Sequence, residues 1–319
     1  MAPRIPLRGG GAAFRPTLDV CLKDKELRTA VQDVAIGRWA GLRDLMERTG
    51  RDWDRRTFRV RVLADAAAAG KCVEAWQIAQ SDNPDATVLR AEVEVVRVFR
   101  LAARDGSVPL DRLDAALQAC LKAARAAEGD PAPLVSLLTV ARLYPNGHPG
   151  IHEWWAELLR RDTYNREGCH QAMRYFSDRY HGSEEVALDF ARDVAQRCPI
   201  GSPLTVLPLV ARVEAFRFRS VGQSTTAPDL NDRWLGIGAV SDLEVALGRW
   251  FNLRIQSNAQ DVSDLHYLAH GLCYANRSQA AAPVFKQIGD LVVGTPWTLF
   301  GEPVTVFSYW RNKALGLTR

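Results

Sequence analysis

Apolar side chains recur along most of the chain three or four residues apart, a spacing that places them on one face of an α-helix. Faces of this kind occupy residues 42–46, 60–67, 88–99, 113–121, 186–194 and 204–210. Glycine and proline interrupt the pattern and leave periodic segments of about 10–20 residues, the ordinary length of a globular helix. The pattern therefore predicts an all-α chain of roughly fourteen helices joined by short turns.

β-Strand patterns are almost absent from the chain. Strand-like runs bounded by turn residues are confined to two short pieces, residues 291–293 and 304–306. Strands therefore make no large contribution to the predicted fold.

Helix pairs of tetratricopeptide character are the next pattern. The segment 264–289 matches one such unit best, with the small residues Ala269 and Ala281 where its two antiparallel helices cross closely. A weaker copy lies around Gly70 and a degenerate one around Gly37, whereas the other helix pairs keep no constant period. We therefore expect an irregular α-solenoid, a tetratricopeptide-like array of antiparallel helix pairs.

The first residues differ from the rest of the chain. They contain three arginines and the triplet Gly9-Gly10-Gly11, without a continuous apolar stretch. We expect a flexible N-terminal lead-in over residues 1–16, which is not a secretory signal, and a single continuous helical-repeat domain over residues 17–319.

The stretch 174–209 carries a more specific resemblance. Arg179, Gly182 and Ser183 match a P-R-W-G-G-S-like turn, and residues 190–192 match the F-A-R of the helix that follows it, while residues 178, 180 and 181 depart from the turn. This combination resembles a bacterial family of helical-repeat proteins of unknown function. The resemblance implies a fold and no chemistry.

The residues of this turn also have a local explanation. Gly182 is expected to take the left-handed conformation that ends a helix. Ser183 is expected to cap the next helix, with Glu184 and Glu185 in its first turn. These residues therefore predict a structural turn.

The charge of the chain is mildly positive and dispersed. Its 41 Lys and Arg residues and 37 Asp and Glu residues give a net charge of +4, and acidic and basic positions alternate after residue 20. A nucleic-acid-binding domain usually concentrates its basic residues in one stripe. The excess of Arg over Lys favours either anion recognition or, as the simpler explanation, a GC-rich genome.

The cysteines and the lack of long apolar segments indicate a cellular location. No segment approaches the ~20 apolar residues that span a bilayer, so we expect no membrane partner and a cytoplasmic protein. The cysteines are widely spaced, without a C-x-x-C pair, and are expected to be buried free thiols. They are Cys21, Cys72, Cys120, Cys169, Cys198 and Cys273.

Two pairs of histidines have the i, i+4 spacing used by metal sites. His266 and His270 lack the glutamate that a metalloprotease needs after its first histidine, because Tyr267 is in that place. We expect this pair to pack on the surface or between helices.

A second histidine pair lies between residues 148 and 170. His148, His152, Cys169 and His170 are ligand types that zinc accepts, and they would form a site only if they converged in space. The chain contains no nucleophile elbow and no Walker A loop. We therefore expect no catalytic residue, no bound metal and no cofactor.

The expected function follows from the architecture, because stacked helix pairs create concave surfaces that bind partners. We expect a non-catalytic interaction module for a peptide or protein. Its candidate contact residues are Arg179 and Tyr180 in the turn and the aromatic pair Trp154 and Trp155, since exposed tryptophans often anchor partners. The alternatives are a nucleic-acid- or nucleotide-associated helical protein and a metal-dependent enzyme.

Overall fold

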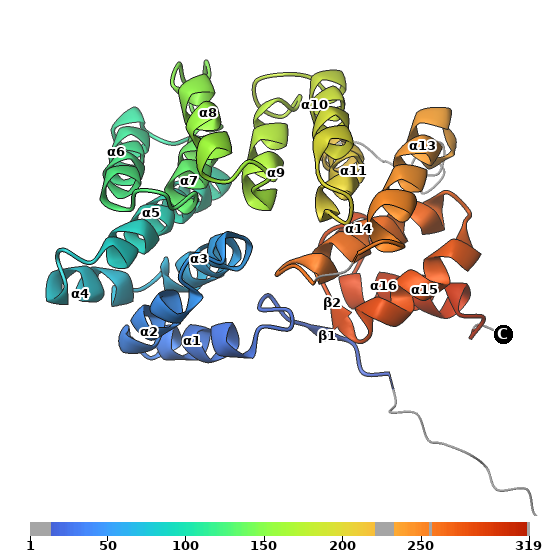
Figure 1. The fold of residues 1–319 in the computed structure, drawn as a ribbon, viewed down its shortest axis with the longest axis horizontal. Coiled ribbons are helices and arrows are strands. Elements are labelled where there is room, and N and C mark those ends of the chain that lie inside the picture. Colours follow the sequence, from blue (N-terminus) through green and yellow to red (C-terminus); the bar gives the residue numbers. More distant parts are fainter. Residues whose placement is uncertain (1–13, 221–232, 255–256, 318–319) are drawn as a thin grey trace, which may run out of the picture.

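The computed structural model describes residues 14–220, 233–254 and 257–317, and within these ranges most residues are helical (Figure 1). The predicted all-α array of helices is therefore confirmed, whereas the solenoid arrangement stays a prediction. Most of the lead-in lies outside the described residues. At its end Phe14 packs against Phe307, with ring centroids 6.3 Å apart.

Six helices form an inner row in which each packs against the next member. They are α3 (Trp53–Ala67), α5 (Pro84–Asp105), α7 (Ala132–Ala141), α9 (Arg166–Tyr175), α11 (Leu207–Arg219) and α14 (Asp261–Tyr274).

Other helices alternate with the inner row along the chain and pack against its members. They are α4 (Cys72–Ala79), α6 (Leu110–Ala126), α8 (Ile151–Arg161), α10 (Glu184–Arg197), α13 (Ile237–Ala246) and α15 (Ser278–Ile288). The array starts with α1 (Lys25–Ala35) and α2 (Ala40–Thr49) and ends with α16 (Pro303–Ala314). Short 3₁₀ turns cover Pro203–Val206 and Trp297–Leu299, and one π-helical turn covers Leu247–Phe251.

The array bends back on itself until its two ends meet. Figure 1 shows the chain passing from α1–α4 over α5–α11 to α13–α16, with β1 (Thr17–Leu18) beside β2 (Leu291–Val292). The two strands pair in parallel, Thr17 with Leu291 and Leu18 with Val292. Of the two short strand-like pieces in the sequence, the one at 291–293 contains β2. Residues 304–306 lie instead in α16, whose first turn is capped by Glu302.

The hydrophobic core has two parts, one formed mainly by α1–α8 and the other mainly by α9–α16. Trp155 packs against both parts. In the second part, Ala269 of α14 and Ala281 of α15 are fully buried where these helices pack together, as predicted for the pair 264–289. Small residues at such a crossing let the two backbones approach closely.

Buried ion pairs tie the inner helices together near their N-terminal ends. Arg56 of α3 donates through Nε to Asp130 at 2.7 Å, before α7, and through Nη2 to Asp85 at 2.5 Å, at the start of α5. Arg166 of α9 donates through Nε to Asp264 of α14 at 2.8 Å. Carboxylates at helix N-termini also interact favourably with the helix dipole.

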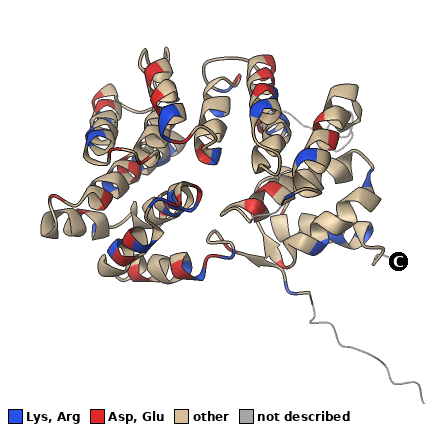
Figure 2. Ribbon diagram, in the orientation of Figure 1, with Lys and Arg blue, Asp and Glu red and all other residues tan. Residues whose placement is uncertain are grey.

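Acidic and basic residues are interspersed along the helices of the array (Figure 2). Among the described residues, no helix is long and apolar enough to cross a membrane.

Candidate ligand-binding cavity

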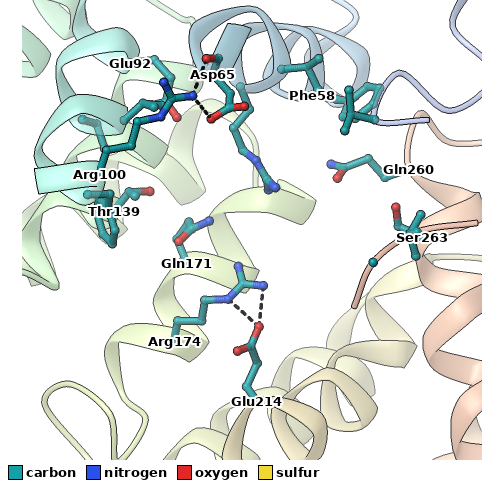
Figure 3. Close-up of a pocket in the computed structure, with 18 of the residues that line it drawn as sticks. Phe58, Asp65, Glu92, Arg100, Thr139, Gln171, Arg174, Glu214, Gln260 and Ser263 are labelled. Carbon is teal, nitrogen blue, oxygen red and sulfur yellow. Dashed lines mark hydrogen bonds and ion pairs between the residues drawn. The ribbon is translucent and has the colours of Figure 1, made fainter. Parts of the chain in front are cut away.

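A cavity of about 770 Å³ lies at the centre of the array, and we call it the central cavity. All six helices of the inner row contribute to its wall, and so do the segments around β1 and β2. Figure 3 shows side chains from several of these helices around the same open space. Pockets of roughly 300–1,000 Å³ hold ligands of drug-like size.

One wall of the central cavity is largely apolar. It contains Phe58 and Val62 of α3, Val96 and Phe99 of α5, and Val293 directly after β2. Removing apolar surface from water is favourable, so this wall can accommodate the apolar part of a ligand.

Arginine side chains dominate the wall formed by α7, α9, the turn after α9 and α11. Arg142, Arg174, Arg179 and Arg217 line it together with one carboxylate, Glu214. Arg174 pairs with Glu214, its Nε and Nη2 lying 3.2 Å and 3.1 Å from Oε1 (Figure 3). The other three arginines form no ion pair with any residue that the structure describes. This wall therefore carries an excess of positive charge.

Arg142 is a buried cation on this wall. Its residue is 9% exposed, and its Nη1 donates to Gln171 Oε1 at 2.7 Å, whereas Nε finds no hydrogen-bond partner in the described part of the chain. Its Cζ lies 4.7 Å from the ring centroid of Phe99 and 4.9 Å from that of Tyr180. Burial, together with the nearby charge of Arg174, lowers the pKa of Arg142 to about 10. The side chain is thus still charged at neutral pH.

Two buried glutamates near the cavity have different charges. Glu92 of α5 is 7% exposed and accepts from Ser136 Oγ at 2.5 Å, and burial raises its pKa to about 7. Glu167 of α9 pairs with Arg61 and accepts from Gln171 Nε2 at 2.5 Å. Although burial acts to raise the pKa of Glu167, Arg61 and other nearby cations hold it well below its usual range. Glu167 is therefore ionised at neutral pH, whereas Glu92 is partly protonated.

Polar groups of α14 face the same space. Gln260 and Ser263 line the cavity, and their side chains make no hydrogen bond within the described residues. Figure 3 shows both on the α14 side, across the open space from Gln171 and Arg174. An amide and a hydroxyl in this position can donate to and accept from a ligand.

The predicted contact residues Arg179 and Tyr180 both line the central cavity. The turn that carries them follows α9, and Tyr180 N donates to Ser177 O at 3.0 Å. Arg179 lies over the ring of Tyr180, with Cζ 5.4 Å from the centroid. The turn therefore brings a cation and an aromatic ring to the cavity wall.

The end of this turn is structural, but not for the expected reason. The prediction of a left-handed Gly182 is wrong, because Gly182 does not have a positive φ. A Cβ at this position would lie 2.1 Å from Phe176 O, so the close approach of two backbone segments requires glycine. Ser183 caps α10 as predicted, its Oγ accepting from Val186 N at 3.2 Å.

The segment 190–192 has a packing role in α10. Phe190 contacts Trp155, with ring centroids 5.5 Å apart, and Ala191 is fully buried. Arg192 donates to both carboxylate oxygens of Asp242 on α13, at 2.9 Å and 3.1 Å. These contacts explain the three residues without a ligand.

Trp154 and Trp155, the other predicted contact residues, do not line the central cavity. Trp154 is 7% exposed and stacks on His148 with ring centroids 4.6 Å apart, while Trp155 packs between the two parts of the core. Their position indicates core packing.

The four candidate zinc ligands do not converge. His148 accepts through Nδ1 from Gly150 N at 3.0 Å, His152 is exposed at the start of α8, and Cys169 and His170 are buried in α9. Within residues 14–220, 233–254 and 257–317, no group of three or more His, Cys, Asp or Glu side chains is placed to hold a metal ion.

His266 and His270 are buried between helices. His266 accepts through Nδ1 from Trp297 Nε1 at 2.7 Å, and its Nε2 lies 3.0 Å from Leu291 O. His270 is 1% exposed among aromatic rings, including those of Trp234 and Tyr274. Burial lowers the pKa of each histidine to about 3, so both are neutral at physiological pH.

Several cavity residues could have been found from the sequence by a different signal. Glu92 follows Val88 by four residues on the apolar face of its helix, and Arg142 follows directly after the apolar segment 132–141. A charged residue on an apolar face is rare unless it is paired or functional. The partners of these charges could not be predicted, because Ser136 and Gln171 are distant in the sequence from the residues that they contact.

Comparisons of the chain with models of protein families, with curated proteins and with solved structures find no match. The resemblance of residues 174–209 to a helical-repeat family therefore stays a prediction.

Proposed function

We propose that this protein is a non-catalytic interaction module that binds a segment of a peptide or protein partner in the central cavity. The observation that carries the proposal is the composition of the cavity wall. An apolar side formed by α3 and α5 and an arginine-rich side formed by α7, α9 and α11 enclose one space of about 770 Å³. Such a wall can bury an apolar side chain and fix a polar group beside it.

The α14 side of the cavity supports a peptide as the occupant. A bound peptide has backbone donors and acceptors that must be satisfied when they leave water. The amide of Gln260 and the hydroxyl of Ser263 offer both kinds of group to it. Concave faces of helix arrays commonly bind extended segments of partners.

The distribution of charge favours a peptide over nucleic acid. Acidic and basic side chains alternate over the helices (Figure 2), and many arginines pair with carboxylates, as Arg100 does with Asp65 at 2.8 Å. A phosphate backbone would require an extended basic stripe. The cavity arginines without an ion pair among the described residues, Arg142, Arg179 and Arg217, lie instead on one wall of the cavity.

The test is selection of peptides from a random library on the immobilised protein, followed by titration of the enriched peptides. We expect dissociation constants near the micromolar range and at least tenfold weaker binding to Ser263→Trp, which fills the cavity from α14. The matched control is Ser107→Trp, at an exposed position after α5 that does not line the cavity. Absence of enriched peptides, or equal binding to both variants, would contradict the proposal.

A further inference from the structure

We propose that Arg142 forms a carboxylate-binding subsite in the central cavity, so that the bound peptide presents an acidic side chain or its C-terminal carboxylate to this guanidinium. The inference rests on the proposed peptide-binding function and specifies the chemistry of the ligand. Arg142 lines the cavity, is nine-tenths buried and has no carboxylate partner among the described residues.

The hydrogen bonds of Arg142 leave Nη2 of the guanidinium for a ligand. Nη1 is held by Gln171 Oε1, and Gln171 is itself fixed through Nε2 by Glu167 at 2.5 Å. Nη2 makes no hydrogen bond within the described chain, whereas Nε is enclosed by protein atoms and has no partner there. A carboxylate that reaches Nη2 gains a charge-assisted hydrogen bond, which is stronger than one between neutral groups.

The surroundings of Arg142 fit a carboxylate with an apolar neighbour. Arg174 and Arg179 add positive charge, and Arg174 is already partly neutralised by Glu214. Phe99, which lies against Arg142, belongs to the apolar wall. A ligand whose carboxylate meets Arg142 can therefore place an apolar group on this wall.

Stacking against aromatic rings does not replace a counter-ion for Arg142. The cation–π contacts with Phe99 and Tyr180 stabilise the charge less than its burial without a counter-ion destabilises it. Other buried arginines of this chain, Arg56 and Arg166, each have carboxylate partners within hydrogen-bonding distance. Arg142 differs from them because no described carboxylate lies within ion-pair distance of it.

The test uses small probes that isolate the carboxylate. 3-Phenylpropanoate carries a carboxylate and an apolar ring, 3-phenylpropanamide is its neutral counterpart, and phenyl phosphate carries a different anion. Binding is measured by titration with NMR detection, including the Nε–Hε resonance of Arg142. We expect 3-phenylpropanoate to bind at least tenfold more tightly than the amide and phenyl phosphate to bind more weakly than the carboxylate.

Substitutions test whether the probe binds at Arg142. Arg142→Met should weaken 3-phenylpropanoate binding at least tenfold, because methionine offers no charged donor to the carboxylate. The control Arg160→Met removes an exposed arginine that pairs with Glu157 and does not line the cavity, and it should change binding less than twofold.

A second pair of variants keeps Arg142 in place. Thr139 lies one helical turn before Arg142 and also lines the cavity, so Thr139→Glu supplies an internal carboxylate to the guanidinium. This variant should lose 3-phenylpropanoate binding, while the neutral Thr139→Gln should keep it. Both should give the wild-type circular dichroism spectrum.

Several results would overturn the subsite. The first is equal binding of the carboxylate and the amide, and the second is unchanged carboxylate binding in folded Arg142→Met or Thr139→Glu. Tighter binding of phenyl phosphate would also reject a carboxylate as the ligand group. For selected peptides, replacing acidic side chains by amides and amidating the C-terminus separates the two sources of the carboxylate. Selected peptides that need no carboxylate would reject the subsite alone, whereas Arg142-dependent probe binding without any peptide binding would reject only the proposed function.

Discussion

Glu92→Gln should make the stability of this protein less dependent on pH. Burial raises the pKa of Glu92 from 4.5 to about 7, against the opposing influence of Ser136, Arg61 and Arg142, while Glu167 acts in the same direction as burial. Below pH 4.5 the carboxyl is protonated in the folded and the unfolded chain. As the pH rises toward 7, the unfolded chain loses this proton first, and the folded state becomes relatively less stable.

The magnitude follows from the two pKa values. The interval from 4.5 to about 7, at about 1.4 kcal/mol per unit of pH, corresponds to about 3 kcal/mol. A glutamine side chain at this position has nearly the shape of the protonated carboxyl and could still accept from Ser136. The free energy of unfolding of Glu92→Gln, relative to wild type, should therefore rise by about 3 kcal/mol between pH 4 and pH 8.

Urea denaturation of both proteins at several pH values between 4 and 8 measures this difference, provided that their m-values agree. Glu128→Gln is the control, because Glu128 is exposed and forms no ion pair with a described residue. Its difference from wild type should stay constant over the same range. A constant or falling difference for Glu92→Gln would mean that Glu92 is ionised and paired in the folded state.

Three further predictions concern the turn, the buried ion pairs and the thiols. Gly182→Ala should destabilise the fold by about 1–3 kcal/mol, because its Cβ would lie 2.1 Å from Phe176 O, and Gly182→Asn should be no better tolerated. Arg166→Met should cost about 3–5 kcal/mol near pH 8 by leaving Asp264 buried without its partner. Burial raises the pKa of Asp264 to about 6 even with Arg166 present, so protonation should reduce this cost at pH 5. The six cysteines are buried with raised pKa values and should react with a thiol reagent only slowly before unfolding.

Controls sharpen each of these measurements. Gly236→Ala has open space around its Cβ and an ordinary φ of −64°, so it should be close to neutral in urea denaturation. If Gly182→Asn were tolerated and Gly182→Ala were not, residue 182 would have a left-handed conformation, which Asn adopts more readily than Ala. Arg197→Met breaks an exposed pair with Asp193 and should cost less than about 1 kcal/mol. Equal costs for Arg197→Met and Arg166→Met, or rapid labelling of several native thiols, would contradict the burial on which the predictions rest.

The helices could be predicted from the sequence because each depends on local signals. Apolar spacing predicts α5 and α10, and Ser183 marks the start of α10. The start of the helix at residues 303–314 was not predicted, because its β-branched residues 304–306 favour a strand. Pro303 at the first helical position and the cap at Glu302 outweigh this strand propensity.

The cavity could be predicted only in part. Arg179 and Tyr180 belong to a recognisable turn, whereas the position of Arg142 on the cavity wall depends on helices distant in the sequence. Trp154 and Trp155 were predicted as contact residues but pack in the core. Their sequence pattern could not decide this, since an aromatic pair looks the same in a core and at a binding surface.

The pairing of β1 with β2 determines when the cavity can exist. Leu18 and Val20 near one end of the described chain, and residues 292–294 near the other, all line it. During synthesis, the inner helices α3, α5 and α7 can pack as soon as they leave the ribosome, because their contacts are with near neighbours in the sequence. The cavity wall, by contrast, is incomplete until β2 has been translated and has met β1. A nascent or C-terminally truncated chain can therefore contain a folded first half and still be unable to hold a ligand.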